Sequence, residues 1–103
     1  MAKSFRLSQP LILLLEMLMG SSAWTYGYEV SRVTGIQPGT LYPLLIRLSD
    51  AGWLSSRWED RVEGGSPPRH LYRLTAEGKR AGRECLARAV SQGWSSGPVG
   101  SLT

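Results

Sequence analysis

The side chains with the most evident chemistry lie in one amphipathic stretch, residues 35–52. Its four leucines recur at the i, i+3, i+4, i+7 spacing of an apolar helix face, whereas Thr40, Tyr42 and Arg47 fall outside that face. A hydroxyl, a phenol and a guanidinium on a leucine-anchored helix suit contacts with phosphates and base edges in a DNA groove. The alternative is an ordinary amphipathic core helix, and the neighbouring segments have to distinguish the two.

Catalytic and metal-binding chemistry finds little support elsewhere in the chain. The sequence has no Ser/His/Asp arrangement, no paired catalytic carboxylates and no phosphate-binding loop that continues into lysine and serine or threonine. His70 is the only histidine and has no cysteine or carboxylate cluster at ligand spacing, so we expect neither a metal nor a cofactor. Cys85 is the only cysteine, which excludes an internal disulfide. We therefore do not expect an enzyme.

Length and composition indicate one small globular domain. The chain has 103 residues, of which 42% are hydrophobic and 19% charged. Lysine and arginine number 12 and aspartate and glutamate 8, a mild excess that permits a polyanionic partner without demanding one. The longest apolar run, residues 11–15, is far shorter than the roughly 20 residues of a membrane span, and no signal peptide is evident. We expect a cytoplasmic protein without a membrane partner.

Two helices joined by a tight turn are expected in the middle of the chain. Thr25 can cap a helix over residues 26–34, and Gly35 can end it in the left-handed conformation. Gly27 lies inside this helix, where glycine usually lets a backbone or a phosphate come close. The expected apolar face of the helix consists of Tyr26, Val30 and Val33.

The next helix is expected to begin between Gln37 and Thr40, with Pro38 suited to its first position. Pro43 requires either a late start or distorted first turns, because it has no N–H to donate. This pair of short helices matches a helix-turn-helix.

After Gly52 the pattern changes from helical to extended. Residues 53–60 and 69–74 alternate in the manner of strands, and the segment RVEGGSPP between them is rich in turn formers. This predicts a β-hairpin with an arginine-bearing edge, the wing of a winged helix. The expected fold is mainly α with a small β-hairpin, and residues 8–75 form the DNA-binding domain.

Helices are also expected at both ends. Ser8 can cap a helix that runs to about Gly20, and Thr75 can cap one over residues 76–92. The first is apolar on nearly all sides, which predicts burial between the chain's own core and a second copy of the chain. The second carries mostly small apolar residues, which favour close approach of another helix. Residues 1–7 are expected to form a flexible basic arm, and residues 93–103 a flexible tail.

Three segments then follow one another in a specific order. They are Tyr-Gly-Tyr-Glu-Val at 26–30, Gly-Thr-Leu-Tyr-Pro-Leu-Leu at 39–45 continued by Arg-Leu at 47–48 and Ala-Gly-Trp-Leu at 51–54, and the basic strand 68–74 that leads into Leu-Thr-Ala-Glu-Gly at 74–78. Together they resemble the PadR family of winged helix-turn-helix transcriptional regulators over roughly residues 11–88. The wing departs from the family: it reads Gly-Gly-Ser-Pro-Pro-Arg-His at 64–70 where members more often carry Gly-Arg-Pro-Arg-Lys, so its tip has fewer cations.

The resemblance implies a homodimer on double-stranded DNA, of the family's short subclass, in which a single C-terminal helix packs with the first helix to form the dimer. The residues expected to contact DNA are Tyr26, Gly39, Thr40, Tyr42, Pro43, Arg47, Arg61, Gly65 and Arg69. Those expected at the dimer interface are Leu11, Leu14, Leu15, Leu18, Ala81, Cys85, Leu86 and Ala89. Family ligands are small and often planar or aromatic, and Met17, Trp24 and Trp94 are the candidates to line such a site.

We therefore expect a sequence-specific transcriptional regulator, a ligand-responsive repressor that binds a palindromic operator with half-sites about 34 Å apart or a multiple of this. The alternative is a winged-helix protein-interaction module without DNA binding, which the cation-poor wing tip and the modest net charge favour. Individual residues also have alternatives: Tyr42 as an edge of the core, and Arg47 as a surface partner of Glu29 or Asp50.

Overall fold

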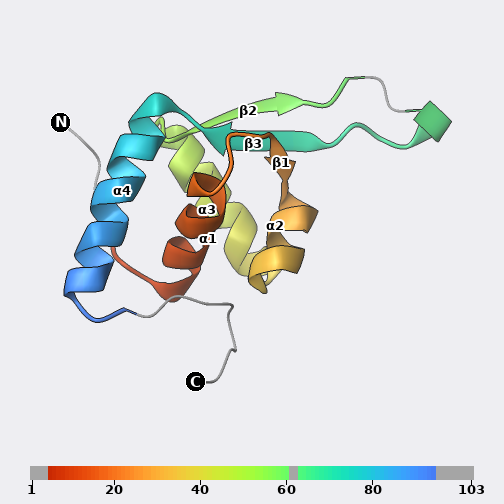
Figure 1. The fold of residues 1–103 in the computed structure, drawn as a ribbon. Coiled ribbons are helices and arrows are strands. Elements are labelled where there is room, and N and C mark those ends of the chain that lie inside the picture. The colour runs from red at the N-terminus through yellow and green to blue at the C-terminus, as the bar shows by residue number, and fades with distance from the viewer. Residues whose placement is uncertain (1–4, 61–62, 95–103) are drawn as a thin grey trace.

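The computed structural model describes residues 5–60 and 63–94. In this part of the chain, four α-helices pack on one side of a small antiparallel sheet (Figure 1). The elements in order are α1 (Gln9–Met19), β1 (Thr25–Tyr26), α2 (Gly27–Thr34), α3 (Pro38–Asp50), β2 (Leu54–Trp58), a 3-10 turn (Glu63–Gly65), β3 (His70–Leu74) and α4 (Ala76–Ser91). None of the described helices is long and apolar enough to cross a membrane. The winged helix-turn-helix expected from the sequence is confirmed.

The sheet has one strand more than the sequence predicted. Its order is β1-β3-β2, and Thr25 and Tyr26 pair antiparallel with Tyr72 and Leu71 of β3. Thr25 is therefore a strand residue and not the expected helix cap. α2 begins at Gly27, and its N-cap residue Tyr26 makes no capping hydrogen bond through its side chain. Strand β1 thus ties the start of α2 to the base of the wing.

The wing itself is the predicted hairpin. Strands β2 and β3 pair along their whole length, from Leu54 opposite Leu74 to Trp58 opposite His70. The hairpin extends well beyond the helices (Figure 1). The 3-10 turn at its tip contains Gly64 with φ +82° and Gly65 with φ +76°, a backbone conformation that side chains other than glycine rarely adopt.

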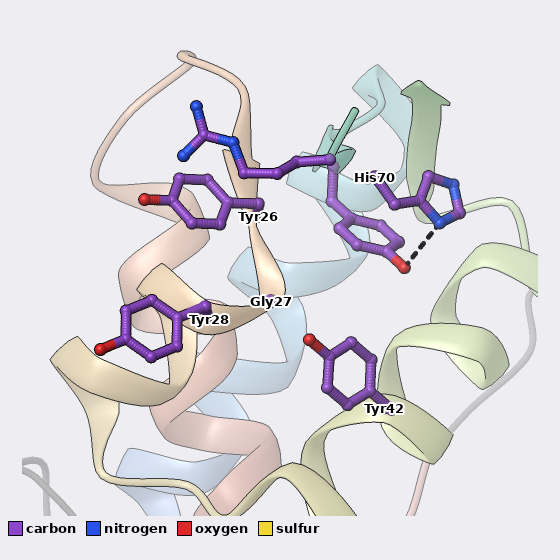
Figure 2. Close-up of a pocket in the computed structure, with 7 residues that line it drawn as sticks. Tyr26, Gly27, Tyr28, Tyr42 and His70 are labelled. Carbon is purple, nitrogen blue, oxygen red and sulfur yellow. Dashed lines mark hydrogen bonds between the residues drawn. The ribbon is translucent and has the colours of Figure 1, made fainter. Parts of the chain in front are cut away.

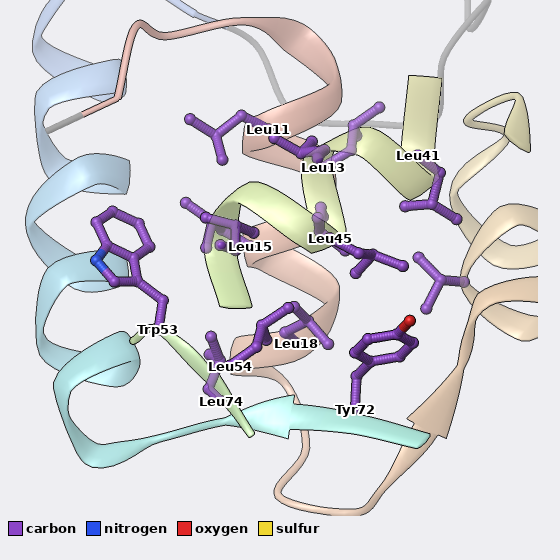
Figure 3. Close-up of a cluster of buried hydrophobic side chains, with 14 of the residues drawn as sticks. Leu11, Leu13, Leu15, Leu18, Leu41, Leu45, Trp53, Leu54, Tyr72 and Leu74 are labelled. Atoms are coloured by element: carbon purple, nitrogen blue, oxygen red, sulfur yellow. The ribbon is translucent and has the colours of Figure 1, made fainter. Parts of the chain in front are cut away.

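The core lies between the helices and the inner face of the sheet. Leucines of α1 and α3 meet in its centre, and Trp53, Leu54, Tyr72 and Leu74 close it from the sheet side (Figure 3). The predicted apolar face of α3 is confirmed, because its four leucines are all buried. These contacts fix the rotation of α3 about its own axis.

Three of the other predicted helix ends are confirmed. Ser8 Oγ accepts a hydrogen bond from the Leu11 N–H at 3.3 Å, and Thr75 Oγ1 accepts one from the Gly78 N–H at 2.9 Å. Gly35 ends α2 with φ +79°. In each case a local signal in the sequence was sufficient, because a cap satisfies N–H or C=O groups only a few residues away.

Helix α2 buries a different face from the one that the sequence predicted. Val30 and Thr34 are buried, whereas Val33 is 47% exposed. Thr34 tolerates burial because its Oγ1 donates to the Val30 carbonyl at 2.7 Å and accepts from the Ile36 N–H at 3.2 Å. The threonine therefore takes the place that the sequence pattern had assigned to valine.

Most of the residues expected at the dimer interface are covered by their own chain, which corrects that expectation. Leu11, Leu14 and Leu15 have no accessible surface in the single chain. The others that are buried are Leu18, Ala81, Cys85 and Ala89. The reason is that the small residues of α4 let the chain's own α1 come close: a Cβ at Gly82 would lie 3.6 Å from Leu15 Cδ2. Of the expected set, Leu86 alone is only partly buried.

The N-terminal arm is not loose where the structure describes it. Phe5 is buried, its ring packs edge-on against Trp53 at 4.8 Å between centroids, and its carbonyl accepts a hydrogen bond from Arg88 at 2.9 Å. Residues 1–4 of the expected arm and residues 95–103 of the expected tail lie outside the described residues. Trp94 continues from α4, and its backbone N–H donates to the Ala89 carbonyl at 3.0 Å.

We expect Gly78→Ala to destabilise the fold. A Cβ at residue 78 would lie 2.0 Å from the Trp53 carbonyl oxygen, which is held in place by the Thr75 N–H at 2.9 Å. Such overpacking costs about 1–3 kcal/mol in the free energy of unfolding, which urea titration followed by tryptophan fluorescence measures.

Gly82→Ala is the matched control in the same helix. The nearest atom to its Cβ would be the flexible Met19 Sδ at 3.4 Å, and alanine is the better helix former by about 1 kcal/mol. Equal stability of the two variants would show that the contact between Trp53 and α4 is not tight.

Candidate nucleic-acid interface

The outer face of α3 carries the predicted contact residues. Thr40, Tyr42, Pro43 and Arg47 are all exposed, while the leucines on the opposite side of the helix are buried. Gly39 is also exposed and has open space around the position that a Cβ would occupy. Five of the nine residues expected to contact DNA are thus brought together on one element.

α3 begins at Pro38, within the range expected from the sequence, and contains Pro43 inside it. Of the two ways in which Pro43 was expected to be tolerated, a late start of the helix does not occur. Because Pro43 has no N–H, the Gly39 carbonyl lacks the donor that an α-helix would normally supply. Both residues are on the solvent side, where water or a ligand can take the place of that donor.

A cavity of about 390 Å³ lies between α2, the first half of α3 and the base of the wing. We call it the tyrosine pocket; it is lined by Tyr26, Gly27, Tyr28, Tyr42, Arg69, His70 and Tyr72. Figure 2 shows Tyr26, Tyr28 and Tyr42 arranged around Gly27, with His70 on the opposite side of the pocket from Tyr28. Burial, and to a smaller extent the neighbouring Tyr42, raises the pKa of Tyr72, so its hydroxyl stays protonated at neutral pH.

Gly27 is needed for this arrangement. A Cβ at residue 27 would lie 2.3 Å from Tyr42 Oη and 2.7 Å from Tyr42 Cε1. The close neighbour that glycine was expected to admit is therefore a phenol of the same chain, and not a backbone or a phosphate. Gly27 lets Tyr42 lie across the start of α2 while the residue remains 43% exposed.

The guanidinium of Arg69 makes contacts within the chain that the sequence did not predict. Its guanidinium makes two hydrogen bonds to the Glu59 carboxylate, at 2.8 and 3.1 Å, and lies 4.1 Å from the centroid of the Tyr26 ring. The pair lowers the pKa of Glu59, chiefly through the hydrogen bond from Arg69. Glu59 thus offsets much of the charge that a phosphate would meet at this point. Arg61 lies outside the described residues.

Arg47 takes neither of the surface partners considered for it in the sequence. Its guanidinium carbon lies 5.4 Å from the centroid of the Phe5 ring, and Glu29 instead pairs with Arg32 at 2.8 Å. The guanidinium remains exposed on the second half of α3, next to the N-terminal segment.

The three residues considered for an effector are not brought together. Met17 and Trp24 line a cavity of about 240 Å³ with Glu29 at its edge, but Trp94 is not among its lining residues. The Trp24 ring also faces two guanidinium groups, of Arg73 at 4.4 Å and of Arg57 at 5.5 Å. Among the described residues, no group of three histidine, cysteine, aspartate or glutamate side chains is arranged to hold a metal ion.

Three exposed apolar side chains near this surface were missed. Tyr28 is 69%, Ile46 59% and Trp58 65% exposed. Tyr28 was visible in the Tyr-Gly-Tyr segment, and Ile46 interrupts the outer face of α3 between Tyr42 and Arg47. Trp58 shares the strand period of buried Leu54, but it lies where the wing has left the core.

A helix-turn-helix followed by a β-hairpin, with exposed polar and aromatic groups on the second helix, defines the winged-helix class of DNA-binding folds. Residues 14–84 match the transcriptional regulator PadR-like family, and the chain belongs to this family. It is therefore a DNA-binding transcriptional regulator by family and not an enzyme.

Solved structures agree with this assignment. A PadR family transcriptional regulator from Eggerthella lenta is 38% identical, with a TM-score of 0.63 over 80% of this chain and 69% of that one. A PadR-like transcription factor from Bacteroides fragilis is 26% identical, with a TM-score of 0.65 over 80% and 81%. Bacillus subtilis PadR in complex with operator DNA shares the fold at 17% identity, with a TM-score of 0.61 over 90% of this chain and 50% of that one. No curated protein matched the sequence.

We expect the Glu59 carboxyl to titrate below its ordinary value of 4.5, because Arg69 bonds to its charged form. Any stability that the ion pair adds is then present above the ordinary pKa and is lost as the pH falls through the lowered one. Carbon-detected NMR of the carboxyl group across an acid titration measures this.

The variant Arg69→Gln should return the pKa of Glu59 towards its ordinary value. If the pKa of Glu59 is the same in both proteins, Arg69 does not pair with this carboxylate in solution.

Proposed function

We propose that this protein is a sequence-specific repressor that binds a palindromic operator as a homodimer and is released by a small effector. The observation that carries the proposal is the outer face of α3. Its polar and aromatic side chains are exposed beside the tyrosine pocket, on a helix whose other side is fixed by buried leucines. In a PadR-like fold this is the helix that can enter a major groove.

The proposed DNA contacts divide by position along α3. Thr40 and Tyr42 lie in the first turns, where a hydroxyl and a phenol can bond phosphate oxygens or base edges. Gly39 and Pro43 present little side chain, which lets the DNA backbone approach the helix. Arg47 follows on the second half and reaches a phosphate if it leaves the Phe5 ring, an exchange that costs about 0.5–1 kcal/mol at an exposed site.

Tyr26 and the wing supply further proposed contacts. Arg69 keeps its Nε and Nη2 bonds to Glu59 and donates to a phosphate from its remaining guanidinium N–H groups, and Gly65 at the tip allows a close approach to the DNA backbone. Arg61 belongs to the proposed set on the strength of its sequence position.

The proposed dimer uses the outer edge of α4. Leu86 is partly buried, Val90 is 77% exposed and Trp94 37% exposed, so each retains apolar surface for a second copy of the chain. This replaces the buried leucines of α1 as the expected contact. Two copies of α3 would then meet half-sites about 34 Å apart or a multiple of this.

The proposed effector is a small planar molecule. The cavity beside Met17 and Trp24 is the candidate site, since it offers an indole and a thioether next to the Glu29 carboxylate. A ligand there acts by favouring a dimer in which the spacing of the two α3 helices no longer matches the operator. The ligand must bind that form of the dimer more tightly than the DNA-binding form.

A gel-shift series tests the proposal against the alternative of a protein-interaction module. We expect the protein to bind DNA from its own upstream region more tightly than unrelated DNA of the same length, with affinity that falls steeply as salt rises. If no fragment is preferred even at low salt, the regulator function is wrong and the protein-interaction module remains.

In the same assay, Tyr42→Ala should weaken operator binding about 10- to 100-fold, the effect of losing a hydrogen bond to a charged group. The phenol lies on the surface, so urea unfolding should show a fold close to that of the original protein. The variant Val33→Ala is the control, since Val33 is similarly exposed but lies on α2 away from the pocket lining. Equal affinities of all three proteins would place Tyr42 outside the DNA interface.

A further inference from the structure

Trp58 is the most exposed tryptophan of the described residues, and neither the core nor the proposed contacts with DNA, effector or a second copy account for it. It is the last residue of β2, next to the part of the hairpin that extends beyond the helices (Figure 1). It is 65% exposed. If this exposed tryptophan had no role, its replacement would leave the function of the protein unchanged. Its surroundings must therefore show whether it is positioned for binding.

Trp58 is held rigidly. It is opposite His70 in the sheet register, and the two rings stack with centroids 4.6 Å apart and an angle of 13° between their planes. His70 Nδ1 in turn is 3.1 Å from the Tyr72 hydroxyl (Figure 2). Tyr72 is buried and belongs to the core (Figure 3). Two successive contacts therefore connect the exposed indole to the core, which reduces the entropy that Trp58 would lose on binding a partner.

The indole is on the side of the wing that faces α3. Directly opposed residues of antiparallel strands project to the same face of a sheet, so Trp58, His70 and Tyr72 share one face. His70 also lines the tyrosine pocket together with Tyr42 of α3. Trp58 thus continues the wall of that pocket towards the tip of the wing.

The acidic residues beside Trp58 are already paired. Glu59 bonds to Arg69 at 2.8 Å, and Asp60 bonds to Arg57 at 3.3 Å. Both carboxylates follow Trp58 directly in the sequence and would otherwise repel a phosphate. With both paired to arginine, a polyanion can approach the indole.

From these observations we infer that Trp58 is a DNA contact of the wing, whose ring packs against the sugar–phosphate backbone beside the groove that α3 enters. The inference rests on the proposed DNA binding. The ring face offers an apolar surface to a deoxyribose, and the indole Nε1–H can donate to a phosphate oxygen. The contact is not ionic, so it releases no counterion and leaves the salt dependence of binding unchanged.

The test is operator affinity across a salt series, measured by fluorescence anisotropy of labelled DNA. Trp58→Ala should weaken binding about tenfold at every salt concentration, as for the loss of the apolar surface that one large side chain buries, with an unchanged salt slope. Trp58→Phe keeps an aromatic ring stacked on His70 and should lose much less affinity for the operator. Val33→Ala is the control, because Val33 is exposed on α2 and belongs neither to the proposed DNA contacts nor to the proposed dimer surface.

A second readout separates contact from a structural role. Tryptophan emission of the original protein should change on addition of operator, and Trp58→Phe should lose most of that change although Trp24, Trp53 and Trp94 remain. Unchanged affinity of Trp58→Ala, or an emission change retained in Trp58→Phe, would overturn the inference. Failure of the original protein to prefer any DNA would instead overturn the proposed function itself.

Discussion

Burial of the leucine face of α3 is the interaction on which the rest of the structure depends. Leu41, Leu45 and Leu48 have no accessible surface, and they meet the leucines of α1 in the centre of the core. Since each fully buried leucine contributes about 1.5–3 kcal/mol, any rotation of α3 that exposes them is strongly disfavoured. The orientation of the opposite face is therefore set by the core, and the exposed groups on that face need no interaction of their own to be held in place.

A second constraint places the wing beside that face. β1 pairs with β3 at the start of α2, and Tyr42 crosses Gly27 at the same point, so α2, α3 and the wing converge on the tyrosine pocket. The pairing of Glu59 with Arg69 reduces both charges near this surface. The proposed DNA contacts at this surface therefore rely more on aromatic and hydroxyl groups than on a dense set of cations, in agreement with a formal net charge of only +4.

Features that depend on short sequence distances could be predicted, and those that depend on distant partners could not. The period of the leucines gave the buried face of α3, and single hydroxyls at Ser8 and Thr75 marked the helix starts. In contrast, β1 has two residues and exists only because β3 pairs with it. The burial of α1 in its own chain likewise depends on the small residues of α4, far away in sequence. The pairing of the Arg69 charge could not be predicted for the same reason, because its partner Glu59 lies across the hairpin.

The most direct test of the account is an NMR titration of the labelled protein with its operator duplex. If the outer face of α3 enters the DNA, the largest amide shift changes will occur at Thr40, Tyr42 and Ile46, with smaller changes along the outer edge of α4. Changes concentrated around Leu86 and Val90, with the amides of α3 unmoved, would contradict the account, because DNA would then meet the surface that we assign to the second copy of the chain.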